Sequence, residues 1–186
     1  MISLAQLWIP ILVSSVLVFI ASSLIHMVFK WHNSDFLKLS NEDEVRAAVN
    51  KTKPAPGQYA LPHCGDMKDM QKPELQQKFK DGPVGLLLLT TPAVPNMGPI
   101  LGKWFALNLV IAVLVAYLAC KSLHTSASFL QVCRLTSVAT FLAYAAGSVS
   151  DGIWFYRPWK GVAKDLLDAS IYATVTALTF AWLWPH

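Results

Sequence analysis

Long apolar stretches alternate with polar segments along the 186 residues of this chain. Four stretches are candidates for helices that cross a membrane: Leu4 to Val28, Trp104 to Cys120, Phe129 to Tyr156 and Ala169 to Trp184. Roughly 20 helical residues span a hydrocarbon core of about 30 Å, because a helix rises about 1.5 Å per residue. The second and fourth stretches are short by this measure, so their flanks must complete the crossing. The pattern predicts an all-α membrane protein with four transmembrane helices in a bundle.

The main polar segment lies between the first two apolar stretches. We expect transmembrane helix 1 in residues 1–29, a cap segment in residues 30–103, and transmembrane helices 2 to 4 in residues 104–186. In the cap, "LSNEDEVRAAV" predicts a short helix with Ser40 at its N-cap and Asp43 three residues later. "KPAPGQYALP" predicts an extended segment around Tyr59, "KPELQQKFKDG" a second helix, and "GPVGLLLLTTP" a strand or a membrane-surface segment. The predicted cap is therefore small and of mixed α+β type.

Composition agrees with a membrane class. Hydrophobic residues make up 54% of the chain and charged residues only 14%, too few to cover the surface of a soluble protein of this size. The net charge of +4 favours contact with anionic lipid, and no basic–aromatic pattern indicates nucleic acid. The expected surroundings of the chain are a lipid bilayer.

The distribution of Lys and Arg predicts an orientation. Of the 15 basic residues, 13 lie in Lys30–Lys103 and Arg157–Lys164. The positive-inside rule places such segments in the cytoplasm. We therefore expect a multi-pass protein of a bacterial inner (cell) membrane, with a cytoplasmic cap and with the N-terminus and C-terminus outside the cytoplasm.

Small and polar residues recur three or four positions apart in the helical stretches, so they share one face of each helix. The predicted interior positions are His26, Asn108, Arg134, Ser137, Tyr144, Ser148, Asp151, Asp168 and Tyr172. Because polar groups are costly against lipid, we expect these faces to turn toward one another. The bundle is thus expected to have a partly polar interior.

This interior has two interpretations. The first is hydrogen-bonded packing, as in a non-enzymatic assembly or accessory component of the membrane. The second is a small channel or transporter with its path around Asp151, because an ionisable residue inside a crossing suggests a functional site. Asp151 is near the end of its stretch, where water or Arg157 is within reach. The sequence therefore favours packing.

A small-residue motif bears on partners. "AYAAGSVSDG" spaces Ala143 and Gly147 four apart, which lets two helix backbones approach closely. We expect self-association into a homo-oligomer, or contact with another membrane protein.

Potential metal ligands gather in "YALPHCGDMKDM". His63, Cys64, Met67 and Met70 are soft or borderline ligands, which gives a third hypothesis of a membrane protein linked to a soft metal ion. Their spacing matches no paired-ligand zinc motif, and methionine is an ordinary packing residue. The sequence favours a structured turn here and otherwise predicts no cofactor.

Catalytic motifs are missing from the sequence, which has no GxSxG, HExxH, phosphate-binding glycine loop or CxxCH. The candidate for a catalytic pair is His26 or His32 with Asp35. Histidines at a membrane interface more often sit there as amphipathic residues, so no catalytic residue is assigned and an enzyme is not favoured.

Cysteine positions leave one alternative open. Cys120 ends the second stretch and Cys133 opens the third, with Ser128 and Gln131 between them spaced like a capping box. An oxidising compartment would permit a disulfide between them. The interpretation we favour is two free thiols, because unpaired cysteine is a common small packing residue.

Overall fold

The computed structural model describes residues 2–185, which are mostly helical. Met1 and His186, at the ends of the predicted domains, lie outside the described residues. The chain divides into two compact units. The first contains the residues up to Phe36, Asn96–Gly152 and the residues from Pro158 onward, and the second contains Leu37–Pro95 with Ile153–Arg157.

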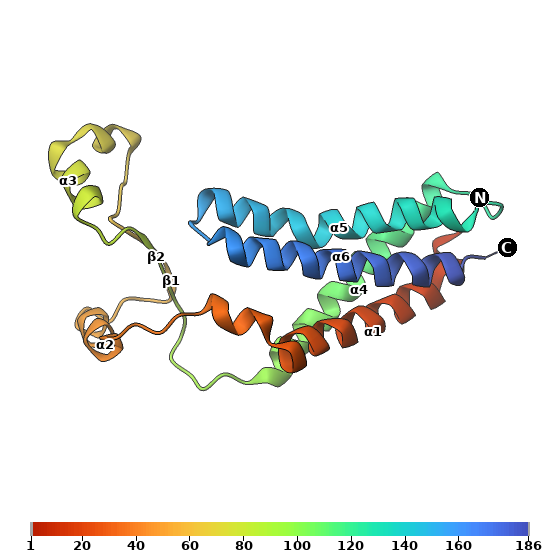
Figure 1. Ribbon diagram of the computed structural model, residues 1–186, viewed down its shortest axis with the longest axis horizontal. Helices are drawn as coiled ribbons and strands as arrows, with labels where there is room; N and C mark the ends of the chain where they lie inside the picture. Colours follow the sequence, from red (N-terminus) through yellow and green to blue (C-terminus); the bar gives the residue numbers. More distant parts are fainter. Residues whose placement is uncertain (1, 186) are drawn as a thin grey trace. The chain divides into compact units, whose positions relative to one another are not determined.

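The first unit is a bundle of long helices that run antiparallel in chain order (Figure 1). Helix α1 (Trp8–Ser23) is extended at its two ends by the short helical segments η1 (Leu4–Leu7) and η2 (Leu24–Phe29). The other helices are α4 (Met97–Ser122), α5 (Phe129–Trp154) and α6 (Trp159–Trp182). Three helices are long and apolar enough to cross a membrane, namely Leu4–Phe29, Met97–Ser122 and Phe129–Trp154. They indicate a membrane-embedded protein.

Two helices begin earlier than the apolar pattern suggests. Helix α4 starts at Met97 rather than Trp104, because the Asn96 side chain caps it by accepting from the backbone N–H of Gly98 at 3.1 Å. The added turns bring α4 to 26 residues, so the flank of the second apolar stretch completes the length of the helix, as expected. Helix α6 starts at Trp159, ten residues before Ala169, and so includes charged residues in its first half. Those charges explain why α6 is not among the three candidate spans.

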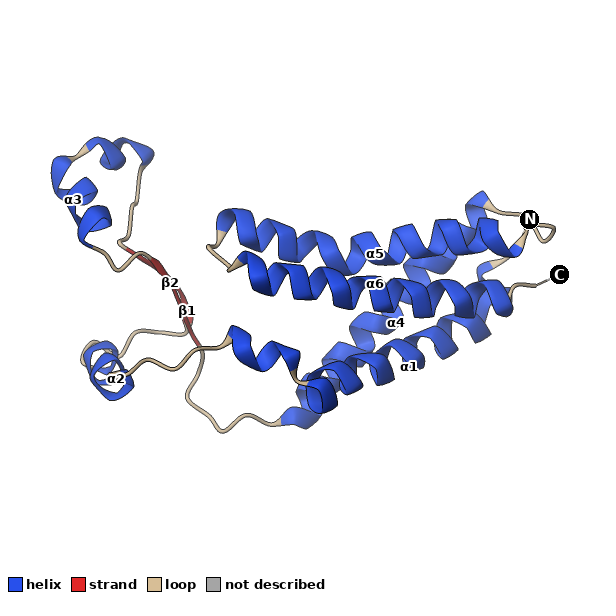
Figure 2. Ribbon diagram, in the orientation of Figure 1, coloured by secondary structure: helices blue, strands red, loops and turns tan. Residues whose placement is uncertain are grey.

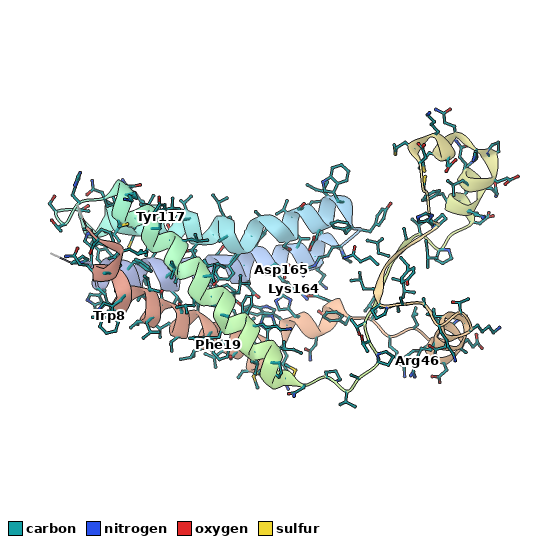
Figure 3. The ribbon with its side chains drawn as sticks, turned by 180° about the vertical axis from the view of Figure 1, so that it is seen from behind. Trp8, Phe19, Arg46, Tyr117, Lys164 and Asp165 are labelled. Atoms are coloured by element: carbon teal, nitrogen blue, oxygen red, sulfur yellow. The ribbon has the colours of Figure 1, made fainter. Side chains whose placement is uncertain are left out.

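Small residues set the packing of the bundle. Helix α1 packs closely against both α4 and α6. Many of the buried residues are Ser or Ala: Ser14, Ser15 and Ser22 on α1, Ala112, Ala116 and Ala119 on α4, and Ala169, Ala173 and Ala177 on α6. Such side chains let helix backbones approach one another. Many large apolar side chains point outward, as Trp8 and Tyr117 do (Figure 3).

One apolar cluster joins four helix ends. Ile2 and Leu7 at the start of the chain pack with Val132 at the start of α5 and with Trp184 beyond α6. The Trp184 indole N–H donates to the carbonyl oxygen of His124, in the α4–α5 connection, at 3.2 Å. The start of α1, the end of α4, the start of α5 and the end of α6 are therefore at the same end of the bundle.

The second unit contains the short elements expected of the cap segment (Figure 2). They are α2 (Glu42–Asn50), β1 (Gly57–Leu61), η4 (Met67–Gln71), α3 (Pro73–Asp81) and β2 (Gly85–Leu89). The strands pair antiparallel, with Tyr59 opposite Leu87, so "GPVGLLLLTTP" forms a strand. The N-cap of α2 is Asn41, not Ser40, since the chain still turns at Ser40. Gly82 ends α3 with a φ of +66°, which glycine adopts without strain.

Candidate functional site

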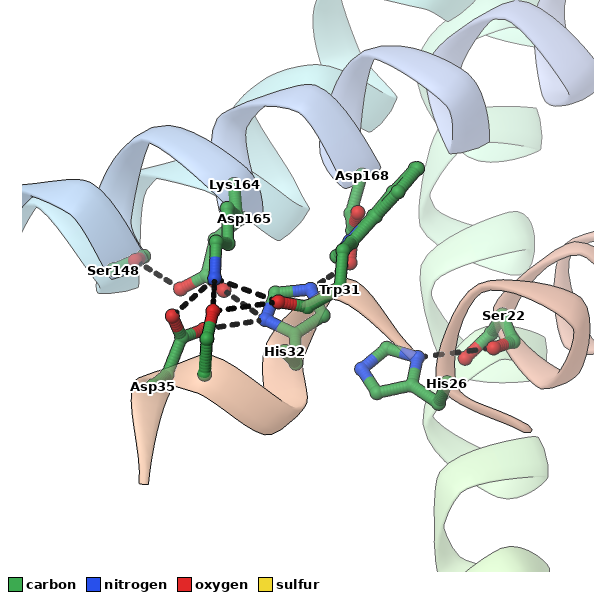
Figure 4. A network of polar contacts seen from close by, with 10 residues as sticks. Ser22, His26, Trp31, His32, Asp35, Ser148, Lys164, Asp165 and Asp168 are labelled. Atoms are coloured by element: carbon green, nitrogen blue, oxygen red, sulfur yellow. Dashed lines mark hydrogen bonds and ion pairs between the residues drawn. The ribbon is translucent and has the colours of Figure 1, made fainter. Parts of the chain in front are cut away.

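The site is built by a short segment, residues 30–35, which we call the return segment. After η2 the chain reverses at Lys30, whose left-handed φ of 53° closes the helix while its N–H bonds the carbonyl oxygen of Ile25 at 2.9 Å. The next residues form the 3₁₀ helix η3 (Trp31–Asp35), which lies against the first turns of α6. His32 and Asp35 thereby meet residues more than 100 positions later in the chain (Figure 4).

His32 lies between two carboxylates. Its Nδ1 is 2.9 Å from Oδ2 of Asp35, and its Nε2 is 2.9 Å from Oδ2 of Asp168. An imidazole donates to both partners only when both ring nitrogens carry protons; otherwise one carboxyl must hold the shared proton. The His32 side chain is 13% exposed, so water shields these contacts poorly.

Lys164 holds the return segment to α6. Its ammonium donates to the carbonyl oxygen of Trp31 at 2.7 Å, to the hydroxyl of Ser34 at 2.8 Å and to the carboxylate of Asp35. This contact holds the pKa of the Asp35 carboxyl below its usual range; partial burial opposes the shift and His32 reinforces it. Asp35 is therefore an anion that is bonded on two sides.

Asp165 brings α5 into the same site. It follows Lys164 on α6 (Figure 3), and its Oδ1 lies 4.0 Å from Nδ1 of His32. The hydroxyl of Ser148, on α5, donates to its Oδ2. We call the set formed by His26, His32, Asp35, Lys164, Asp165 and Asp168 the histidine–aspartate cluster.

His26 completes the histidine–aspartate cluster from the end of the first helix. Its ring stacks on that of His32, with the centroids 4.8 Å apart and the planes 5° from parallel. Its Nδ1 donates to the carbonyl oxygen of Ser22 at 2.9 Å, so the lone pair is on Nε2. Ligand atoms of His26, His32 and Asp168 all lie within 4.8 Å of one another.

Deeper in the bundle, two predicted interior residues are hydrogen-bonded. The hydroxyl of Tyr144 donates to Oδ1 of Asn108 at 2.8 Å. Tyr172 packs edge-on against Tyr144, with centroids 5.1 Å apart, and Trp104 covers both rings. A cleft beside these residues is too small to hold a water molecule; it is lined by Ser14, Ser15, Val18, Asn108, Ile111, Ala112, Tyr144 and Thr176.

The remaining predicted interior positions are spread along α5. Ser148 is buried and joins the histidine–aspartate cluster through Asp165. Asp151 and Ser137 are half-buried, whereas Arg134 is exposed and so lies outside the interior. The hydroxyl of Ser137 donates to the carbonyl oxygen of Arg134 at 3.2 Å, which satisfies it within its own helix.

Sequence reasoning identified only part of the histidine–aspartate cluster. It named His26 and Asp168 as interior residues and considered His32 with Asp35, but it did not single out Lys164 or Asp165. The available signal was "AKDLLD", which places charges on the first turns of α6. Of the charged residues in this motif, only Asp168 was assigned to the polar face of the last helix.

The segment from His63 to Met70 forms a capped turn in the second unit. The Cys64 thiol donates to the carbonyl oxygen of Asp66 at 3.1 Å, and Oδ1 of Asp66 accepts from the N–H of Lys68 at 3.0 Å. Met67 and Met70 are exposed. Within residues 2–185, neither His63 nor Cys64 belongs to a group of three His, Cys, Asp or Glu residues with converging ligand atoms.

The chain matches no protein-family model, and no curated protein or solved structure is significantly similar to it.

Proposed function

We propose that this chain is a small integral membrane protein with four crossings, and that it serves as a non-enzymatic assembly or accessory component. The fourth crossing is α6, whose 24 residues give a length of about 36 Å, enough for a bilayer core. Its antiparallel place beside α1, and the position of Trp184 next to Leu7, support this assignment.

The observation that carries the assembly role is the close packing of the polar interior. Tyr144 and Asn108 bond each other, and the neighbouring cleft has no room for water. A path for solutes needs hydrated space, whereas hydrogen-bonded packing does not. At one end, the histidine–aspartate cluster ties the return segment to α6, which further favours a rigid bundle.

A topology experiment tests the four crossings. Reporters are fused after His186 and inserted near Lys68 in the full-length chain. Four crossings with a cytoplasmic second unit require Lys68 inside and His186 outside. Both reporters inside would mean that α6 does not cross, and Lys68 outside would overturn the orientation.

Cation or proton handling is the second candidate, and it is favoured by the placement of ionisable groups at the end of the bundle. Asp168 is only 5% exposed and contacts His32, so the functional carboxylate on this view is Asp168 instead of Asp151. Proton flux into proteoliposomes tests it, with Asp168→Asn compared with Asp151→Asn. The assembly role predicts flux no greater than in protein-free liposomes. If the wild type shows proton flux and Asp168→Asn abolishes that flux, the second candidate replaces the assembly role.

Self-association is part of the proposal, because Ala143 and Gly147 are both exposed on α5. Among residues 2–185, no atom outside the local helix backbone lies within 4 Å of a Cβ added at Gly147. Gly147→Ile is expected to lower the oligomer fraction measured by light scattering in detergent. Gly102→Ile, at an equally open glycine of α4, is the matched control. An unchanged oligomer in both variants would exclude this face as the contact.

A further inference from the structure

We infer that His26, His32 and Asp168 form a binding site for a divalent transition-metal ion, of which Zn²⁺ is the representative probe. The three side chains come from two separate parts of the helical unit, and their ligand atoms already lie within 4.8 Å of one another. Zinc binds histidine nitrogen and carboxylate oxygen at about 2.0–2.2 Å, which separates neighbouring ligand atoms by roughly 3.4 Å in a tetrahedron. An ion bound here would widen the 2.9 Å contact between His32 Nε2 and Asp168 Oδ2.

The Asp168 carboxylate provides an independent indication of a ligand. It is 5% exposed, and its Oδ1 has no hydrogen-bond partner among residues 2–185. A buried carboxylate oxygen without a partner is costly, and native proteins rarely leave one so. A cation bound next to the contact between Asp168 and His32 would supply the missing partner.

Both histidines are oriented by groups that a metal site requires. In His26, the bond from Nδ1 to Ser22 fixes the tautomer that leaves Nε2 free to bind a metal. In His32, Nε2 faces Asp168 while Nδ1 faces Asp35. A carboxylate on the distal nitrogen of a metal-binding histidine sets its orientation and raises its basicity. Asp35 would have that role, and Lys164 holds Asp35 in place.

The ligand types determine the class of ion. Two imidazoles and one carboxylate suit Zn²⁺ and neighbouring first-row ions, whereas Mg²⁺ and Ca²⁺ prefer oxygen ligands throughout. Three protein ligands leave a coordination position for water or an external group. Because His26 is exposed, an ion can enter from its side. This inference goes beyond the assembly role and does not depend on whether α6 crosses the membrane.

Metal titration of the full-length protein in detergent tests the site. After chelator treatment, Zn²⁺ binding is measured by calorimetry, and Co²⁺ binding by its visible absorption. One equivalent is expected for the wild type. His26→Ala is the decisive variant, because this side chain is exposed, and we expect its loss to leave the fold intact. It should abolish binding while the melting temperature without metal stays unchanged.

Two further variants and a control locate the ion. Asp168→Asn should also abolish binding, and Asp35→Asn should weaken it about 10–100-fold, as expected for an orienting partner. The double variant His63→Ala with Cys64→Ser should bind like the wild type. Absence of binding to the wild type, or full binding by His26→Ala, would overturn the proposal. Loss of binding only in the His63 and Cys64 variant would also overturn the proposal, because the ion would then lie in the second unit.

Discussion

The Nε2 atom of His32 lies 2.9 Å from Oδ2 of Asp168, although 136 positions separate the two residues in the sequence. The contact joins the return segment after the first helix to the last helix of the bundle. Because both side chains are largely buried, the contact bears on stability as well as on any ion held there.

Loss of the His32 ring should destabilise the bundle. His32→Ala leaves the buried Oδ2 of Asp168 without its hydrogen-bond partner, which costs about 1–3 kcal/mol of unfolding free energy. Chemical unfolding in detergent, with chelator present, measures the difference. His124→Ala, which removes an exposed ring, is the control and should be neutral. Equal stability of the two variants would show that the contact between His32 and Asp168 does not stabilise the fold.

Removal of the Lys164 ammonium should loosen the return segment. Lys164→Met keeps the length of the side chain but deletes its donors to Trp31, Ser34 and Asp35. Amide hydrogen exchange should then rise in residues 31–35, and α6 should stay protected. The exposed Lys160 on the same helix provides the control, Lys160→Met, for which no change is expected. Unchanged hydrogen exchange in both variants would contradict the conclusion that Lys164 stabilises the return segment.

Removal of a single hydroxyl oxygen tests the hydrogen bonding inside the bundle. Tyr144→Phe deletes the hydroxyl that donates to Asn108, and the expected loss of unfolding free energy is about 0.6 kcal/mol. Tyr117→Phe makes the same change on an exposed tyrosine of α4 and should have no effect. A loss in the Tyr117 variant as large as in the Tyr144 variant would mean that the interior bond is not the cause.

Gly152, near the end of α5, packs closely against the start of α6, so one methyl group added at Gly152 should lower the stability of the bundle. A Cβ at Gly152 would lie 3.1 Å from Cγ2 of Val162 and 3.4 Å from the Trp159 ring. Gly152→Ala should therefore destabilise by about 1–3 kcal/mol, as overpacking does. Gly147→Ala is the matched control in the same helix, where the added group meets open space. A stable Gly152 variant would show that these helix ends separate easily.

Thiol counting checks the state of the cysteines. Cys120 and Cys133 are unpaired in the structure; their thiols donate to the carbonyl oxygens of Tyr117 at 3.2 Å and Ala177 at 3.6 Å. Labelling under denaturing conditions without reductant should give three free thiols, including Cys64. A count of one would indicate a disulfide between Cys120 and Cys133.

Local signals in the sequence were sufficient for most elements. The capping box at the start of α5 is confirmed, since Ser128 N–H donates to Gln131 Oε1 at 2.8 Å and Gln131 N–H to Ser128 Oγ at 3.4 Å. Apolar runs located the long helices, and proline and glycine bounded the short ones. Helix α6 begins ten residues before the apolar stretch at Ala169, because the helix continues through the charged residues of its flank.

The histidine–aspartate cluster could be predicted only in pieces. The spacing of His32 and Asp35 is local, and so is that of Lys164 and Asp168. Their meeting depends on the reversal at Lys30, a non-glycine residue with positive φ that no sequence pattern announces. It also depends on which helix lies beside α1, which periodicity along a single helix does not determine.

The packing of α1 against α6 has a consequence for the order of biogenesis. A chain is made from its N-terminus, so α1 is synthesised well before α6. Until α6 is made, α1 lacks one of the two helices that it packs against, and the ring of His32 lacks Asp168. The contact between His32 and Asp168 can therefore form only after the chain has been extended by a further 136 residues beyond His32.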